Sequence, residues 1–351
     1  MSAERRIRVL VVEDSAFARK VLRETLKAEP DLEVVDTARD GLEALEKIQA
    51  LQPDVVTLDL VMPHLDGVGV LRALSPPAGP RVVVVSTSPA ESELGAEALE
   101  LGAVELVQKP TALATDRLYE LGQALVRAVR AAYAADPSRR PTHSPPAVPP
   151  TGLRRSPQPS GTRFRIVCVG TSTGGPPALT QLLGALPADL PVPVAVVLHI
   201  PPGYTEAIAR RLDALSPLHV VEVSEGLRLT PGMVGIAPGG QHLTVRREGE
   251  LLVARLAARP LDTPHRPSVD VLFESASAAV GDAVLGVVLT GMGDDGLAGA
   301  RQIRAAGGAV LTEARETCVV YGMPRTVAEA GLSDGQVPLD LMAEAIHRRL
   351  G

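Results

Sequence analysis

The sequence predicts an α/β protein made of two doubly wound parallel-sheet domains joined by a proline-rich linker. Two observations lead to this fold class. On both sides of the linker, short aliphatic runs alternate with longer helical stretches, as in sheets whose strands are connected by helices. Residues 137–161 carry eight prolines, four arginines and no acidic residue, so this segment cannot build a hydrophobic core. We therefore expect domains at residues 1–133 and 163–351, with the linker at residues 134–162.

The first domain contains four apolar runs that we expect to form buried strands. The runs are IRVLVV at residues 7–12, DVVTLD at 54–59, RVVVVS at 81–86 and AVELVQ at 103–108. Nearly continuous Val, Leu and Ile are typical of parallel strands that are covered by helices on both faces. The stretch AFARKVLRETLKAE, which follows the first run, has the spacing of a helix.

The second domain repeats this alternation with different residues after its strands. Its predicted strands are RIVCVG at residues 165–170, VPVAVVLH at 192–199, AVLGVVLT at 283–290 and GAVLTE at 308–313. We expect a second parallel sheet here, because long crossover segments separate these runs.

Composition and charge exclude several classes of function. Hydrophobic residues make up 45% of the 351 positions, but there are only three Phe, four Tyr and no Trp, so the cores are aliphatic. The net charge of −6 argues against a nucleic-acid partner, and the two cysteines make no disulfide framework or metal cluster. No apolar run approaches a membrane span, and the N-terminal residues do not form a signal peptide. We expect a cytoplasmic monomer without membrane insertion.

Acidic residues follow two predicted strands of the first domain. Glu13 and Asp14 come after the first strand, and Asp59 ends the second of the four runs. Carboxyl ends of parallel strands share one edge of a sheet, where three carboxylates repel one another unless a cation such as Mg²⁺ lies between them. Acids at strand ends are also common as turn and cap residues. Ser86 and Lys109, at the next two strand ends, favour a phosphorylatable site in which Asp59 is the nucleophile and these two side chains bind the phosphoryl oxygens.

The first domain resembles the response-regulator receiver domain. The resemblance runs from about residue 6 to about residue 130 and depends on VVEDSAFARKVL, PDVVTLDLVMPHLDG and VQKP. It implies a five-stranded flavodoxin-like fold that accepts phosphate on Asp59 from a histidine kinase. It also implies Mg²⁺ held by Glu13, Asp14, Asp59 and the backbone carbonyl of Val61.

The stretch IVCVGTSTGGPP at residues 166–177 permits two interpretations. A glycine-rich turn after a strand can bind phosphate, whereas the frame from Gly170 to Gly174 can present Ser172 as a nucleophile. A phosphate-binding loop needs a lysine at its end, and PPALT follows here instead. A serine nucleophile needs a base and an acid. His199 ends the next predicted strand, and a third strand end carries Asp294 and Asp295, so we favour the nucleophile.

The predicted hydrolytic site also needs donors for an oxyanion. The backbone N–H of Thr173, directly after the nucleophile, is one candidate, and the turn near Met292 supplies another. The chain order serine, histidine, aspartate differs from that of α/β-hydrolases, so a different sheet must carry this turn.

The second domain resembles the chemotaxis protein-glutamate methylesterases from about residue 163 to the end. The matching motifs are GTSTGG, HIPPGYTEAIARRL, IAPGGQHL, HRPSVDVLF, LTGMGDDG and CVVYGMP. The resemblance implies Ser172 as nucleophile, His199 as base and Asp295, rather than Asp294, as the acid. The catalytic domain would need no cofactor. It would demethylate glutamates and deamidate glutamines on the cytoplasmic helices of chemoreceptors. We expect a structural or substrate-contacting role for His265.

Two other functions remain open at this point. The chain could be a non-enzymatic response regulator whose second domain only binds a partner, or a general esterase for small molecules. An activated serine that reacts with a phosphonate would separate an enzyme from the binding module. Demethylation of receptor fragments would separate a protein methylesterase from the general esterase.

Overall fold

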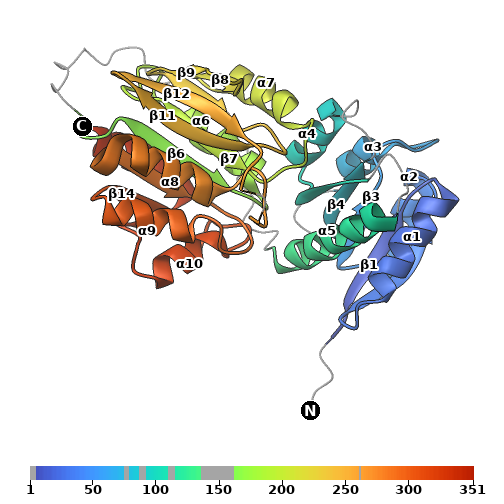
Figure 1. Ribbon diagram of the computed structural model, residues 1–351. Helices are drawn as coiled ribbons and strands as arrows, with labels where there is room; N and C mark the ends of the chain where they lie inside the picture. Colours follow the sequence, from blue (N-terminus) through green and yellow to red (C-terminus); the bar gives the residue numbers. More distant parts are fainter. Residues whose placement is uncertain (1–4, 75–78, 87–91, 110–114, 136–161, 261) are drawn as a thin grey trace. The chain divides into compact units, whose positions relative to one another are not determined.

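The computed structural model describes residues 5–74, 79–86, 92–109, 115–135, 162–260 and 262–351 (Figure 1). The chain divides into two compact units, Met1–Ser138 and Arg139–Gly351. Most of the linker predicted at residues 134–162 lies outside the described residues, so the boundaries given above stay predictions.

The first unit alternates strands with helices. In chain order its elements are β1 (Ile7–Val12), α1 (Ala16–Lys27), β2 (Leu32–Ala38), α2 (Gly41–Leu51), β3 (Val55–Leu58), α3 (Gly67–Ala73), β4 (Arg81–Ser86), α4 (Ser92–Glu100), β5 (Glu105–Gln108) and α5 (Thr115–Ala134).

The strands of the first unit form a parallel sheet in the order β2-β1-β3-β4-β5 within the described residues. This order is that of flavodoxin-like folds and confirms the prediction. All four apolar runs form strands, and the side chains of β3 are buried without exception. The strand that the sequence did not reveal is β2, an edge strand in which Glu33 and Asp36 interrupt the apolar run and most side chains are partly exposed.

The second unit is larger and contains more strands. Its elements are β6 (Ile166–Thr171), α6 (Gly175–Ala185), β7 (Val194–Leu198), α7 (Thr205–Leu215), β8 (His219–Glu222), β9 (Arg228–Leu229), β10 (Met233–Ile236), β11 (His242–Glu248), β12 (Leu251–Ala257), α8 (Val269–Val280), a 3₁₀ turn (Gly281–Ala283), β13 (Val284–Val288), α9 (Leu297–Ala305), β14 (Ala309–Glu313), α10 (Met323–Glu329), β15 (Gln336–Val337) and α11 (Leu339–Leu350).

Most of these strands form one parallel sheet, in the order β15-β14-β13-β6-β7-β10-β8 among the described residues. The four predicted strands occupy its centre, and every side chain of β6, β7, β13 and β14 is buried. The predicted second parallel sheet is therefore confirmed. Because all its strands point the same way, the residues that follow β6, β7, β13 and β14 lie at one edge of the sheet.

A small antiparallel sheet, in the order β11-β12-β9, was not predicted. Its hairpin turns at Gly249, whose φ of 63° suits the first position of a two-residue turn. Helix α8 lies against β11 (Figure 1). There the Ser275 hydroxyl accepts a hydrogen bond of 3.0 Å from the Val245 amide. This sheet therefore covers one side of α8, the helix that begins beside the candidate active site.

Within the described residues, no helix has both the length and the apolar character that a membrane crossing requires.

Candidate functional site

Ser172 lies in a tight turn between β6 and α6. The side chain is 9% exposed, directly after the last residue of the strand. Gly174 has a φ of 79°, a left-handed conformation that favours glycine, and a Cβ there would approach Val319 to 2.7 Å. The turn therefore depends on the glycine that follows the serine by two positions, as the nucleophile interpretation requires.

His199 follows the neighbouring strand β7. Thr171 and Leu198 are register partners in β6 and β7, and the His199 amide donates to the Thr171 carbonyl over 3.1 Å. Ser172 and His199 therefore leave adjacent parallel strands at the same end of the sheet, and neighbouring strands lie about 5 Å apart.

Asp295 forms a short contact with this histidine. Its Oδ2 atom lies 2.7 Å from His199 Nε2 and also accepts from the Val269 amide over 2.8 Å. Its Oδ1 atom accepts from the Ser268 hydroxyl over 2.9 Å and from the Asp270 amide over 3.0 Å. Burial alone would raise the pKa of Asp295, but the hydrogen bond from His199 and the backbone amides together hold it well below its usual range. The group is a buried carboxylate.

The contact with Asp295 determines which nitrogen of His199 can act as a base. A carboxylate cannot donate, so Nε2 carries the proton in the neutral ring and Nδ1 keeps its lone pair. Nδ1 is buried and has no hydrogen-bond partner in the described part of the chain. Ser172 makes no hydrogen bond to it there. The imidazole is thus held by one nitrogen and presents the other as a free acceptor.

His265 lies flat against the His199 ring. The two ring centroids are 4.0 Å apart and the planes differ by 12°. This stacking limits rotation of the His199 ring, and the structural or substrate-contacting role expected for His265 stays a prediction.

The two adjacent aspartates have different surroundings. Asp295 is buried, whereas the Asp294 side chain is exposed and its backbone carbonyl accepts from the Leu297 amide at the start of α9. Of the two, only Asp295 contacts His199 among the described residues. The structure thus brings together the pair that the resemblance implied. The catalytic roles of Ser172, His199 and Asp295 stay predictions.

The two predicted oxyanion donors belong to segments close to the nucleophile. Thr173 is buried in the turn after Ser172. The turn after β13 also comes close, since a Cβ on Gly291 would lie 2.9 Å from the Ser172 Cβ. Met292 follows that glycine, and its amide donates to no acceptor in the described residues. This arrangement is compatible with the predicted roles of both amides.

The acidic residues predicted in the first unit also converge. Ligand atoms of Glu13, Asp14 and Asp59 lie within 4.8 Å of one another. Lys109 Nζ lies 2.6 Å from Glu13 Oε2 and 2.8 Å from Asp59 Oδ2. Ser86 is buried at the end of β4, next to the strand that leads to Lys109.

One lysine does not neutralise three carboxylates. Burial raises the pKa of Glu13 to about 7, against the opposing effect of Lys109. Burial likewise raises the pKa of Asp59, again opposed by Lys109. Burial would lower the pKa of Lys109, but Asp59 and Glu13 raise it. With one ammonium for three acids, the cluster has the oxygen donors and the excess negative charge that suit a divalent cation.

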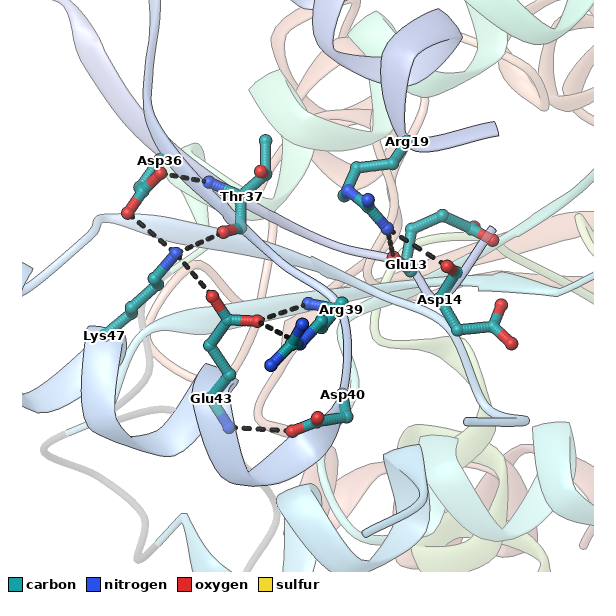
Figure 2. Close-up of polar contacts among 9 residues, drawn as sticks. All are labelled: Glu13, Asp14, Arg19, Asp36, Thr37, Arg39, Asp40, Glu43 and Lys47. Atoms are coloured by element: carbon teal, nitrogen blue, oxygen red, sulfur yellow. Dashed lines mark hydrogen bonds and ion pairs between the residues drawn. The ribbon is translucent and has the colours of Figure 1, made fainter. Parts of the chain in front are cut away.

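The backbone of this cluster is held by Arg19 on α1. Its guanidinium donates to the Glu13 carbonyl over 2.7 Å and to the Asp14 carbonyl over 3.1 Å (Figure 2). Val61 contributes its amide, 3.4 Å from Asp59 Oδ1. The predicted use of its carbonyl as a metal ligand stays a prediction.

Figure 2 also shows an ion-pair network beside this cluster. Lys47 on α2 contacts Asp36 on β2 at 2.9 Å and Glu43 at 2.8 Å, so it ties α2 to the edge strand. These side chains are partly exposed, so we assign the network a structural role of modest energy.

Comparison with known protein families assigns a family to each of the two units. The model of the CheB methylesterase family matches residues 167–346, about half of the chain. This chain belongs to the CheB methylesterase family. The model of the response regulator receiver domain matches residues 9–120, so the chain combines the two modules.

Relatives in the CheB methylesterase family align over almost the whole chain. A protein-glutamate methylesterase/protein-glutamine glutaminase 5 of Myxococcus xanthus is 59% identical over 98% of both chains. One of Symbiobacterium thermophilum is 46% identical over 99% of this chain and 98% of its own. The crystal structure of the CheB methylesterase catalytic domain of Thermotoga maritima is 39% identical, with a TM-score of 0.52, and covers 53% of this chain and 98% of its own.

Sequence reasoning missed several residues that shape the site of this CheB family member. Ser268 and Val269 donate hydrogen bonds to Asp295, and the Thr290 carbonyl accepts one from the Ser172 amide. For Ser268, the signal was present in HRPSVDVLF, because a serine before an apolar helical run is typical of a helix N-cap. For Thr290, no local pattern distinguishes it from any residue at a strand end.

Proposed function

We propose that this chain is a phosphorylation-activated protein-glutamate methylesterase that also deamidates glutamines, acting on chemoreceptors in chemosensory adaptation. The single observation that carries the proposal is the buried His199–Asp295 pair, which keeps Nδ1 free at the strand end next to that of Ser172. A module that only binds a partner has no need of such a pair. The names of the relatives that span the chain also favour the enzyme over a non-enzymatic response regulator.

Ester hydrolysis begins with the attack of Ser172. The Oγ atom forms a bond to the carbonyl carbon of the glutamyl methyl ester while its proton passes to His199 Nδ1. The charge on His199 is stabilised by Asp295. The former carbonyl oxygen becomes an oxyanion, which the amides of Thr173 and Met292 stabilise.

The same residues complete the reaction. The C–O bond to the methoxy group breaks, and the leaving group takes the proton from His199 and departs as methanol. Water then attacks the acyl-serine with His199 again as base, which releases glutamate and restores Ser172. A glutamine side chain follows the same course with ammonia as leaving group, so one site serves both reactions.

The first unit would receive the phosphoryl group on Asp59. Glu13, Asp14, Asp59 and the Val61 carbonyl would hold Mg²⁺, which when bound neutralises charge on the carboxylates and the phosphoryl group. The buried Lys109 ammonium lies 2.8 Å from Asp59, where it can bind a phosphoryl oxygen, and Ser86 provides a hydroxyl at the adjacent strand end.

The proposed partners follow from these two sites. A histidine kinase would supply the phosphoryl group, and methylated cytoplasmic helices of chemoreceptors would be the substrate. We therefore place the protein in the cytoplasm as part of the proposal.

The test is methanol release from methylated receptor fragments by the full-length chain, with and without a small-molecule phosphodonor. We expect release that rises with phosphodonor and disappears in Ser172→Ala. Ser268→Ala retains the nucleophile but loses one hydrogen bond to Asp295, so it should lower methanol release without abolishing it. Hydrolysis of p-nitrophenyl acetate without any methanol release from receptors would instead indicate a general esterase. A lack of reaction with both substrates and with a serine-reactive phosphonate would refute the enzyme.

A further inference from the structure

Thr290, two residues beyond β13, holds the nucleophile turn through its carbonyl group. The carbonyl oxygen accepts from the Ser172 amide over 3.1 Å and from the Thr171 hydroxyl over 2.8 Å. One peptide group of the neighbouring strand end thus fixes the backbone on which the predicted nucleophile is carried.

The hydroxyl of Thr290 holds the other side of the same turn. It donates to the Thr173 carbonyl over 3.0 Å, with the Val320 carbonyl at 3.3 Å, and it accepts from the Val320 amide over 3.0 Å. The Val320 carbonyl in turn accepts from the Gly291 amide over 3.1 Å. The Thr173 amide therefore directly follows Ser172, which Thr290 holds, and the Met292 amide directly follows Gly291, which Thr290 holds through Val320.

The amide of Thr290 is held by Glu313, the last residue of β14. Glu313 Oε2 accepts from this amide over 2.7 Å, and the residue is fully buried. Its other oxygen, Oε1, makes no hydrogen bond in the described part of the chain, and Glu313 forms no ion pair there. Burial raises its pKa to about 7, an effect that the hydrogen bond from the Thr290 amide opposes but does not cancel.

A carboxyl group without a counter-ion is a costly group to bury. An apolar residue of the same size would suit the core at this position better, unless the bond to Thr290 is needed. The cost therefore indicates that the hydrogen bond from the Thr290 amide to Glu313 is needed. Thr290 in turn accepts a hydrogen bond from the Ser172 amide, so the need concerns the Ser172 turn.

We propose that Glu313 is a positioning residue of the hydrolytic site: through Thr290 it fixes the turn of Ser172 and the approach of the Gly291–Met292 segment. It touches no reacting atom. This inference rests on the proposed function, because it concerns the same serine.

The test compares three variants of Glu313 in the full-length chain. Glu313→Met keeps the volume but removes the acceptor, Glu313→Asp moves the acceptor back by one methylene, and Glu313→Gln keeps a carbonyl oxygen at the same distance. The rates measured are hydrolysis of p-nitrophenyl acetate and inactivation by a serine-reactive phosphonate, with thermal denaturation as the check on folding.

We expect Glu313→Met to lower kcat and the rate of phosphonate inactivation by about 10- to 100-fold. The variant leaves the buried N–H of Thr290 unpaired, and the cost of such a group corresponds to roughly one to two powers of ten in rate. KM should stay within about twofold, since no substrate contact is lost. Glu313→Gln should restore the rate to within about threefold of the original chain. If Glu313→Met does not fold, Glu313→Asp serves in its place, with an expected loss of about tenfold.

Three results would overturn the inference. They are an unchanged kcat in folded Glu313→Met or Glu313→Asp, a change confined to KM, or a rate for Glu313→Gln as low as that of Glu313→Met. Failure of the proposed function looks different, because the unaltered chain would then react with neither the ester nor the phosphonate.

Discussion

Replacing Asp295 by asparagine removes the negative charge beside His199 and leaves the size of the side chain almost unchanged. The carboxylate accepts four hydrogen bonds, two on each oxygen, and two of the four donors are the backbone amides of Val269 and Asp270. An asparagine has one acceptor oxygen, so in either orientation its NH₂ group faces one of these amides. We expect one unsatisfied buried N–H and a loss of stability of about 1–3 kcal/mol.

The effect on catalysis should be much larger than the effect on stability. If the NH₂ group faces His199, the ring must carry its proton on Nδ1, and the base is blocked. If the oxygen faces His199, the tautomer is kept but the imidazolium formed during attack loses its counter-charge. Either way we expect kcat to fall by about 10⁴, the typical loss when the aspartate of a serine triad becomes asparagine.

The assay is methanol release from methylated receptor fragments, together with a thermal denaturation curve for each variant. Asp294→Asn is the matched control, because it makes the same chemical change at the adjacent, exposed position. We expect it to keep kcat within about threefold. The reasoning fails if Asp295→Asn retains more than a tenth of the activity, or if Asp294→Asn is the more damaging change.

Three further predictions concern stability, phosphorylation and control. Because the pKa of Glu313 is raised from 4.5 to about 7 in the folded chain, its contribution to stability is complete below pH 4.5 and is lost as pH rises through 7. Urea denaturation should show that the free energy of unfolding falls by roughly 3 kcal/mol over this range in the original chain but not in Glu313→Gln, and an equal dependence on pH in the two chains would contradict this. Phosphorylation by a small-molecule donor should require Mg²⁺ and disappear in Asp59→Asn, while Glu13→Gln and Asp14→Asn should raise the Mg²⁺ concentration needed; phosphate found on Ser86 instead would reject the site. A fragment of residues 163–351 should hydrolyse receptor esters faster than the unphosphorylated full-length chain if the first unit inhibits, and a slower fragment would mean that the first unit assists catalysis.

The buried strands and the residues that follow them could be predicted from the sequence. Runs such as RVVVVS and AVLGVVLT form strands because only burial on both faces tolerates such continuous aliphatic residues. In a parallel sheet the residue after each run must lie at one edge, so the sequence already places Ser172 and His199 at the same edge of one sheet, and Asp59 and Lys109 at the same edge of the other. The strands β2, β11 and β12 escaped prediction because polar residues interrupt their apolar pattern and leave them partly exposed.

Tertiary structure alone decided which group contacts which. Asp294 and Asp295 have the same chemistry, and only the packing of the turn before α9 against the start of α8 buries one and exposes the other. The free nitrogen of His199 is likewise a result of where Asp295 lies. Glu313 acquires its link to Ser172 through the peptide of Thr290, which lies just past the end of a different strand and more than 20 residues away in sequence. Sequence patterns report burial and local geometry, whereas hydrogen bonds between strand ends depend on distances that only the folded sheet defines.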